Sequence, residues 1–280
     1  MRNLTSQKRR LGREAQPQEI RVKCLSSDYD GTISPIEASR VESRVPLRTR
    51  AVLREIGSFL PISIITMKDL PFIVPRTPFA QAWSAIGGLE MRVGKRVLKS
   101  EHFEHKLTSI SLGINYAISH ISSAGVEIEE KQDSEGDIIA FCVDWRQAKD
   151  LKAAKQETEC VATYCKGLGL SVIRYETQPF YDVYPVAPDK GGALREMLNE
   201  LAVKNGVLYL GDSKTDNPAF RASNVSLGVL HNESPLGTLD CDYLVKFESV
   251  PDFLHALFIN DFRFTPDFPM IKINTNRRRE

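Results

Sequence analysis

The chain has 280 residues, of which 42% are hydrophobic and 26% are charged. This is an ordinary composition for a soluble globular protein, and the length suits two modest domains or one domain with an insertion. A formal net charge of +1 gives no reason to expect a nucleic-acid partner or attachment to a membrane surface. No apolar run approaches the roughly 20 residues that span a bilayer, and the polar amino-terminal end lacks the apolar core of a signal peptide. The five scattered cysteines favour free thiols in a reducing, cytoplasmic setting.

Both ends of the chain are polar and basic. Residues 1–19 include Lys8-Arg9-Arg10, and the chain ends close after Arg277-Arg278-Arg279. We expect a disordered basic tail over residues 1–19 and a second tail over residues 263–280. A nucleic-acid arm or an organelle address is the alternative for these segments.

Strand and helix signals alternate over residues 20–99 and again over residues 186–262. The expected elements, in chain order, are strands at 22–28 and 62–65 around a helix at 47–60, extended segments at 83–86 and 91–98, a helix at 192–201, and strands at 207–210, 225–229 and 243–245. Such alternation predicts an α/β core with a Rossmann-like, mainly parallel sheet covered by helices on both faces.

Residues 100–185 have a different rhythm. They predict a helix over 103–123, strands at 126–131 and 138–145, a helix over 147–166, and strands at 170–175 and 181–184. Helix, hairpin, helix, hairpin is a self-contained α+β unit. Because it interrupts the alternating pattern, we interpret it as an inserted second domain.

The stretch Asp28-Tyr29-Asp30-Gly31-Thr32 follows the first predicted strand. Residues i and i+2 of a strand point to one face, so Asp28 and Asp30 are expected to converge. Gly31 allows the chain to turn sharply after them. Paired acids at a strand end suit a nucleophile and a general acid/base near a divalent cation.

Three further polar motifs follow strands or begin helices. Thr66 ends a buried strand, where its hydroxyl either binds an anionic oxygen or simply caps the next segment. Lys190 precedes Gly191-Gly192 at a helix start, which predicts a phosphate site, although a solvated lysine is the alternative. Asp212 and Asp216 follow another strand, in a loop suited to a cation. Open α/β sheets bind ligands at the edge where such strands end, so we expect all four motifs to meet there.

These residues resemble, in the same order, the four motifs of the haloacid dehalogenase (HAD) superfamily of phosphoryl-transfer enzymes. The inserted unit resembles that superfamily's type-2 α+β cap, and the motifs are most similar to those of trehalose-6-phosphate phosphatases. The resemblance covers residues 22–258 and leaves both tails outside it. The sequence departs from that family's pattern at Thr66-Met67-Lys68 in the second motif and at Ser26-Ser27 in the first strand. The expected substrate is therefore either trehalose 6-phosphate or a related glycosyl phosphate.

The resemblance implies a role for each motif residue. Asp28 is the expected nucleophile and Asp30 the expected general acid/base, while Thr66 and Lys190 hold the phosphoryl oxygens. Mg²⁺ is expected on Asp28, Asp212 and the backbone carbonyl of Asp30, because an all-oxygen ligand set suits this ion. Asp216 is expected to support the site by orienting Lys190 or a metal-bound water.

The cap is expected to bind the sugar. Glu130, Lys131 and Arg146 are the candidates for contacts with sugar hydroxyls, and each is otherwise an exposed charge on a cap strand. The predicted function is a Mg²⁺-dependent sugar-phosphate phosphatase with a small-molecule substrate. A phosphomannomutase-like phosphomutase and a non-catalytic sugar-phosphate-binding module are the alternatives. We expect a monomer, since the sequence contains no sustained heptad pattern.

Overall fold

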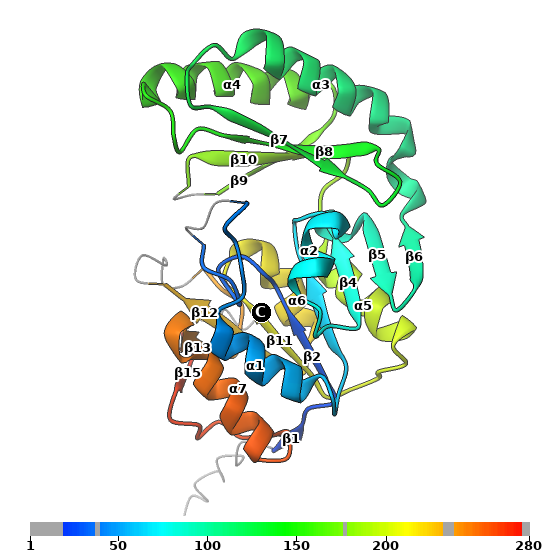
Figure 1. Ribbon diagram of the computed structural model, residues 1–280, viewed down its shortest axis with the longest axis vertical. Helices are drawn as coiled ribbons and strands as arrows, with labels where there is room; N and C mark the ends of the chain where they lie inside the picture. Colours follow the sequence, from blue (N-terminus) through cyan, green and yellow to red (C-terminus); the bar gives the residue numbers. More distant parts are fainter. Residues whose placement is uncertain (1–18, 37–39, 176–177, 232–237, 276–280) are drawn as a thin grey trace, which may run out of the picture.

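The computed structural model describes residues 19–36, 40–175, 178–231 and 238–275. Within this part of the chain, no helix combines the length and the apolar character that crossing a bilayer would need. Of the tails predicted over residues 1–19 and 263–280, residues 1–18 and 276–280 lie outside the described residues. The chain forms a lower body around a large sheet and an upper unit that sits over one edge of it (Figure 1).

The lower body contains a nine-stranded sheet in the order β15-β13-β12-β11-β2-β3-β4-β5-β6. The strands are β2 (Cys24–Ser27), β3 (Ile62–Ile65), β4 (Ala82–Ala85), β5 (Glu90–Val93), β6 (Arg96–Lys99), β11 (Val207–Gly211), β12 (Val225–Leu230), β13 (Tyr243–Lys246) and β15 (Ile271–Ile273). The six strands from β13 to β4 in this order are parallel, whereas β15, β5 and β6 run antiparallel to their neighbours. The expected α/β core is therefore confirmed.

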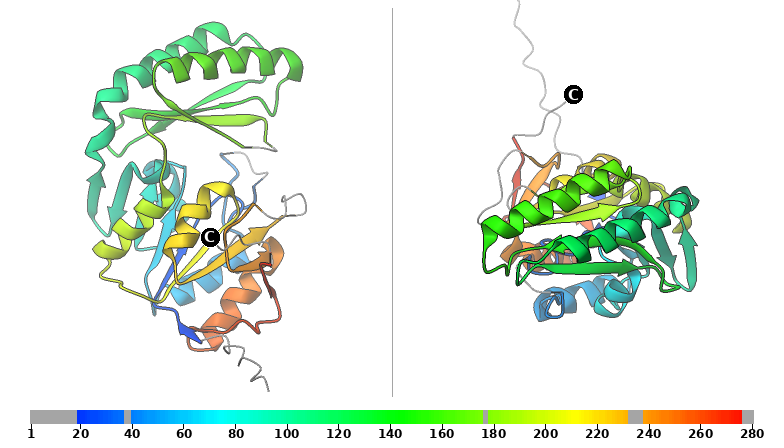
Figure 2. Two further views of the ribbon diagram at one scale, coloured as in Figure 1. Left: turned by 180° about the vertical axis from the view of Figure 1, so that it is seen from behind. Right: turned by 90° about the horizontal axis from the view of Figure 1, so that it is seen from above.

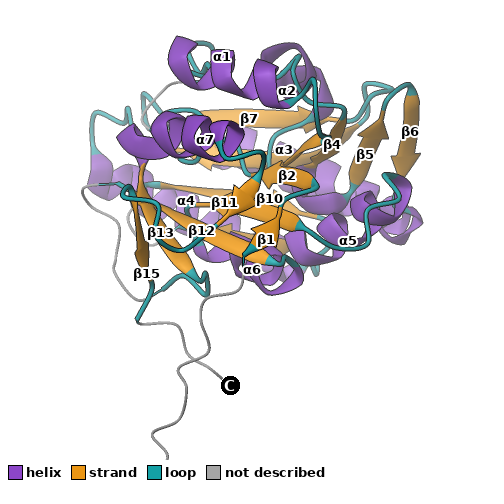
Figure 3. Ribbon diagram, turned by 90° about the horizontal axis from the view of Figure 1, so that it is seen from below, coloured by secondary structure: helices purple, strands orange, loops and turns teal. Residues whose placement is uncertain are grey.

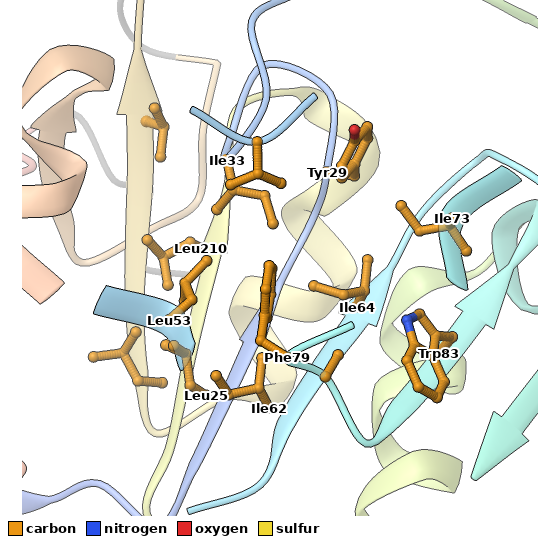
Figure 4. Close-up of a cluster of buried hydrophobic side chains, with 14 of the residues drawn as sticks. Leu25, Tyr29, Ile33, Leu53, Ile62, Ile64, Ile73, Phe79, Trp83 and Leu210 are labelled. Carbon is orange, nitrogen blue, oxygen red and sulfur yellow. The ribbon is translucent and has the colours of Figure 1, made fainter. Parts of the chain in front are cut away.

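Helices cover both faces of this sheet (Figure 3). One face carries α1 (Leu47–Ile56), α2 (Leu70–Arg76) and α7 (Val250–Ile259), and the other carries α5 (Lys190–Glu200) and α6 (Asn217–Ala222). Figure 4 shows side chains of the first face, among them Leu25, Leu53, Ile64 and Leu210, packed into one buried cluster. Burial of this apolar surface holds the strand ends in fixed positions.

Two polar residues inside β2 are satisfied by hydrogen bonds. Ser26 Oγ lies 2.6 Å from Ser63 Oγ of the neighbouring strand β3, and Ser27 Oγ donates to the Asp28 carbonyl at 2.6 Å. A buried hydroxyl is tolerated when it has such a partner. The central strand therefore remains buried along its whole length although it ends in two serines.

The upper unit lies between β6 and α5 in the chain. It consists of η2 (Glu101–Lys106), α3 (Leu107–His120), β7 (Glu127–Gln132), β8 (Ile138–Asp144), α4 (Leu151–Gly167), β9 (Ser171–Arg174) and β10 (Phe180–Tyr184). Its antiparallel sheet has the order β7-β8-β10-β9. Both long helices lie on the outer side, so the open face of this sheet is turned toward the core (Figure 2). We call this unit the cap.

The structure differs from the expected elements in two places. Residues 263–280 do not form a tail throughout, since β14 (Arg263–Phe264) pairs with β1 (Ile20–Arg21) and β15 pairs with β13. Phe264 is buried and anchors this segment. The helix α2 was not predicted because Pro71 and Pro75 lie within it, but Asp69 caps its first turn, where a proline is tolerated.

Candidate active site

The first acidic motif lies at the carboxyl end of β2, in the middle of the sheet. The backbone nitrogen of Asp28 donates to the Leu210 carbonyl at 2.9 Å, which places Asp28 beside the end of β11. Tyr29 is fully buried in the hydrophobic core against Phe72. With Tyr29 turned into the core, Asp28 and Asp30 both line a cavity between core and cap.

Gly31 makes the turn that brings the first and fourth motifs together. It has a φ of +75°, and a Cβ at this position would lie 2.1 Å from Asp212 Oδ2. Only glycine fits both the left-handed backbone and this close approach. Thr32 Oγ1 donates to Asp212 Oδ1 at 3.4 Å, and His231 Nε2 lies 2.5 Å from the Gly31 carbonyl oxygen. The turn is thus held on both sides.

Lys190 links two of the acidic motifs. Its Nζ lies 2.9 Å from Asp28 Oδ2 and 2.8 Å from Asp216 Oδ1, and its side chain is 1% exposed. Burial alone would lower the pKa of Lys190, but Asp216 and Asp28 raise it above its ordinary value. The residue that begins α5 is therefore a buried cation at the carboxyl end of β2.

Asp216 organises the loop that follows β11. Its Oδ1 accepts hydrogen bonds from Lys190 and from the Tyr209 hydroxyl at 2.7 Å. Its Oδ2 accepts from the backbone nitrogens of Asp212 and Ser213 at 3.2 and 3.1 Å, and from Ser213 Oγ at 3.0 Å. With both oxygens engaged, Asp216 orients Lys190 and shapes the loop that carries Asp212.

The carboxylates of Asp28, Asp212 and Asp216 form a cluster whose oxygen atoms lie within 4.8 Å of one another. Burial, strengthened by the charge of Asp216, raises the pKa of Asp28 to about 7 against the opposing effect of Lys190. Burial and the charge of Asp28 also raise the pKa of Asp212 well above its ordinary value. Three carboxyl groups beside one lysine cannot all ionise without cost, and a divalent cation would offset that cost. Asp28 and Asp212 offer the hard oxygen ligands that Mg²⁺ prefers. The residues present fit such an ion.

Other predicted core residues reach the same cavity, whose volume is about 120 Å³. Thr66 is buried at the end of β3, and its Oγ1 accepts a hydrogen bond from the Lys68 backbone nitrogen at 3.2 Å. The Asp30 side chain is more open, with Lys68 Nζ 3.8 Å from its Oδ2 and Ser43 Oγ 3.5 Å from its Oδ1. The structure thus brings all four motifs to one edge of the sheet.

Two of the three predicted cap residues also line the cavity. Lys131 Nζ donates to Asp182 Oδ1 at 2.6 Å and to the Tyr184 hydroxyl at 2.9 Å, and all three side chains are buried. Arg146 forms an ion pair of 2.6 Å with Asp144 and lies over the Phe180 ring. Lys131, Asp182 and Arg146 thus line the cap side of the cavity, together with core residues such as Asp28 and Lys190.

Glu130 does not belong to this wall. Among the described residues that line the cavity, β7 contributes Glu129 and Lys131, whereas Glu130 is exposed. Alternate residues of a strand share a face, so the neighbours of Lys131 on the cavity side are two positions away from it. The structure thus places Glu129 on the cavity and Glu130 away from it, and the alternation around Lys131 was the signal that could have found Glu129.

Further cavity residues were not predicted from the sequence. Asp182 accepts hydrogen bonds from Lys131 and, at 2.7 Å, from the Tyr175 hydroxyl, and both Asp182 and Tyr175 line the cavity. Lys68 also lines the cavity. An acid in the middle of the buried strand β10 was the available signal for Asp182.

No protein-family model matches the sequence, and no curated protein matches it either. Solved structures do match, and they define the class of fold. The chain has the fold of HAD superfamily phosphatases, a Rossmann-like core with an inserted cap, which is the fold that the motif resemblance implied.

Three of these structures are similar to the chain over most of their length. A trehalose-6-phosphate phosphatase related protein has a TM-score of 0.67 at 15% identity, covering 85% of this chain and 97% of its own. The C-terminal domain of the trehalose-6-phosphate phosphatase of C. albicans has a TM-score of 0.64 at 18% identity, covering 85% and 92%. A HAD subclass IIB sugar phosphatase has a TM-score of 0.57 at 15% identity, covering 86% and 100%.

Proposed function

We propose that this protein is a Mg²⁺-dependent phosphatase that hydrolyses a sugar phosphomonoester, either trehalose 6-phosphate or a related glycosyl phosphate. The observation that carries the proposal is the buried Lys190, 2.9 Å from Asp28 and 2.8 Å from Asp216, beside Asp212. This arrangement brings together a nucleophile (Asp28), a cation for the phosphoryl oxygens (Lys190) and a pair of carboxylates for a metal (Asp28 and Asp212). A polar cap wall over it supplies partners for sugar hydroxyls.

The first half of the reaction uses the two acids of the first motif. An oxygen of Asp28 forms a bond to phosphorus while the bond between phosphorus and the sugar oxygen breaks, which gives an aspartyl-phosphate. Asp30 donates its proton to the departing sugar oxygen. Lys190 and the Thr66 hydroxyl hold the phosphoryl oxygens as negative charge moves between them.

The second half regenerates the free enzyme. Asp30, now a carboxylate, takes a proton from a water whose oxygen bonds to phosphorus, and the bond between phosphorus and Asp28 breaks. Inorganic phosphate leaves. Asp28, Asp212 and the backbone carbonyl of Asp30 would hold Mg²⁺, which lowers the repulsion between the nucleophile and the phosphate and stabilises charge.

The cap supports a sugar rather than a bare phosphate as the substrate. Lys131, Asp182 and Glu129 offer charged hydrogen-bonding groups on the cavity wall, and Phe180 offers an aromatic face beneath Arg146. Such a mixture suits a polyhydroxylated ligand, because hydroxyl groups both donate and accept. The cap also separates the reacting groups from bulk water.

The test is release of inorganic phosphate from a panel of trehalose 6-phosphate, sucrose 6-phosphate, mannosyl- and glucosyl-3-phosphoglycerate and hexose monophosphates, with and without Mg²⁺. The variant Asp28→Asn keeps the shape of the side chain and removes the nucleophile, so it should lose several orders of magnitude in kcat. Asp252→Asn, an exposed acid on α7, is the matched control. Turnover near wild type in Asp28→Asn would refute the covalent mechanism.

Two other results would redirect the proposal. Slow phosphate release that a sugar bisphosphate activates would point to a phosphomutase. Tight binding of a sugar phosphate without turnover dependent on Asp28 would point to a binding module.

A further inference from the structure

The core holds Arg40 firmly in front of helix α2. Arg40 Nη2 lies 2.5 Å from Asp69 Oδ2, and the Asp69 side chain is 3% exposed. The same carboxylate caps α2 by accepting a hydrogen bond from the Phe72 backbone nitrogen at 2.8 Å. The Arg40 guanidinium also lies 4.7 Å from the centre of the Phe72 ring, a favourable cation–π arrangement. The position of this guanidinium is therefore set by groups that do not belong to the cap.

The other side of the guanidinium reaches the cap. Arg40 Nη1 donates to Glu129 Oε1 on β7, and Glu129 lines the cavity. Lys68 Nζ lies 3.9 Å from the same oxygen and 3.8 Å from Asp30 Oδ2. One cap carboxylate thus meets two core cations, and one of these cations also lies beside the proposed general acid.

The Arg40 guanidinium retains its charge. Burial alone would lower the pKa of Arg40, but the carboxylates of Glu129 and Asp69 raise it above its ordinary value. Glu129 is 23% exposed and Arg40 is 31% exposed as side chains. Partial burial weakens screening by water and salt, so this pair is stronger than a fully exposed one.

A second set of contacts joins the far end of β7 to the core. Lys99 Nζ lies 2.7 Å from Asp133 Oδ2 and 2.8 Å from Glu135 Oε2, and Glu90 Oε1 accepts a hydrogen bond from the Ser134 nitrogen at 2.9 Å. The residues of this second anchor do not line the cavity. Of the two anchors, the Arg40 pair is the one that holds a cavity-lining side chain.

We propose that Arg40 is a positioning residue for substrate recognition. Its guanidinium, which belongs to the core, holds the Glu129 carboxylate of the cap at the cavity wall, where this carboxylate contacts the sugar. The inference rests on the proposed function, because it assigns Glu129 to the sugar. A phosphate ester with a sugar meets a carboxylate that is already oriented. An ester whose leaving group does not reach the cap wall gains no binding energy from the oriented Glu129 carboxylate.

Steady-state kinetics separate this role from a general structural one. With the best sugar phosphate of the panel, Arg40→Gln should raise KM about tenfold and change kcat less than about twofold, since uniform binding is lost. With p-nitrophenyl phosphate, kcat/KM should stay unchanged. Arg40→Lys should restore part of the affinity. Glu129→Gln should match Arg40→Gln, and the double variant should be no weaker than either single variant, because the two residues act as a pair.

Lys99→Gln is the matched control. It also breaks an ion pair between core and cap, but away from the cavity, so KM for the sugar phosphate should stay at the wild-type value. An equal rise of KM in Lys99→Gln and Arg40→Gln would overturn the proposal, because docking of the cap in general would then explain both. An unchanged KM in Arg40→Gln would overturn it as well.

A second readout does not depend on turnover. Cys160 on α4 is the exposed cysteine among the five, so it can carry a spin label, with a partner label introduced by Ala51→Cys on the exposed side of α1. Without substrate, Arg40→Gln should broaden the distance distribution between the labels. Arg221→Gln, which breaks an exposed pair with Asp240 inside the core, should not.

The two readouts distinguish two kinds of failure. If the wild-type protein hydrolyses no member of the panel, the proposed function fails, and the distance measurement alone decides whether Arg40 holds the cap. If the distribution in Arg40→Gln equals that of the wild type, Arg40 does not fix the cap wall and the inference is wrong.

Discussion

The ammonium of Lys190 lies 2.9 Å from the Asp28 carboxylate in the interior of the protein, where both side chains are less than a tenth exposed. Each group depends on the other, because a buried charge without a partner is costly. Lys190→Met should therefore abolish turnover and also lower the free energy of unfolding by about 3–5 kcal/mol. Chemical denaturation beside a phosphate-release assay checks both effects. A variant with full stability and no activity would mean that the pair serves catalysis alone.

Gly31 provides a test of the contact between the first and fourth motifs. In Gly31→Ala, the new methyl group would collide with Asp212 Oδ2, so affinity for Mg²⁺ should fall at least tenfold, as expected for a disturbed ligand environment. Gly136→Ala is the matched control, since Gly136 has a φ of +93° with no atom near the position of a Cβ. Both variants carry backbone strain, but only the first should weaken Mg²⁺ binding in titration calorimetry. Equal affinities would contradict the close approach.

The raised pKa of Asp28 predicts how stability depends on pH without Mg²⁺. The carboxyl has a pKa of about 7 in the folded protein and an ordinary value of 3.8, so between about pH 4 and pH 7 the folded state binds more protons than the unfolded state. Stability should then fall as the pH rises through this window, by up to about 1.4 kcal/mol per pH unit. Asp28→Asn should flatten the profile, and Mg²⁺ should restore stability near pH 7. Urea denaturation across this range measures the slope, and a slope that is unchanged in Asp28→Asn would disprove the assignment.

Two adjacent glutamates of β7 form a matched pair. Glu129 lines the cavity and Glu130 is exposed. Glu129→Gln should raise KM for the sugar phosphate about tenfold, the range for a lost charged hydrogen bond, while Glu130→Gln should behave as the wild type. If Glu130→Gln weakens binding instead, the register of β7 relative to the cavity is different from the one described.

The meeting of the four motifs at one edge of the sheet could be predicted from the sequence because its determinants are local. Asp28 and Asp30 follow one strand two residues apart, Gly31 marks the turn, and Asp212 follows a short buried strand. The carboxyl ends of parallel strands meet at one edge whatever the exact boundaries are. The four motifs could therefore be placed together without a structure.

The cap wall could be predicted only in part because it depends on register. A shift of one residue along β7 exchanges the side that faces the cavity for the opposite side of the sheet, which is the difference between Glu129 and Glu130. The contact of Arg40 with Glu129 joins residues 89 positions apart. No local pattern marks it, since it exists only when the cap lies on the core.

The chain leaves the cap at Tyr184 and reaches Lys190 at the start of α5 after only residues 185–189. This exit is pinned to the core just before the lysine: Asp189 N donates to the Gly87 carbonyl at 3.0 Å, and Pro188 packs where a Cβ on Gly87 would clash at 2.2 Å. The position of Lys190 is therefore fixed by contacts with the core and not by the cap. The cap is in this sense an exchangeable module, so we expect that a different cap grafted between Lys99 and Pro188 would leave Lys190 in its place beside Asp28.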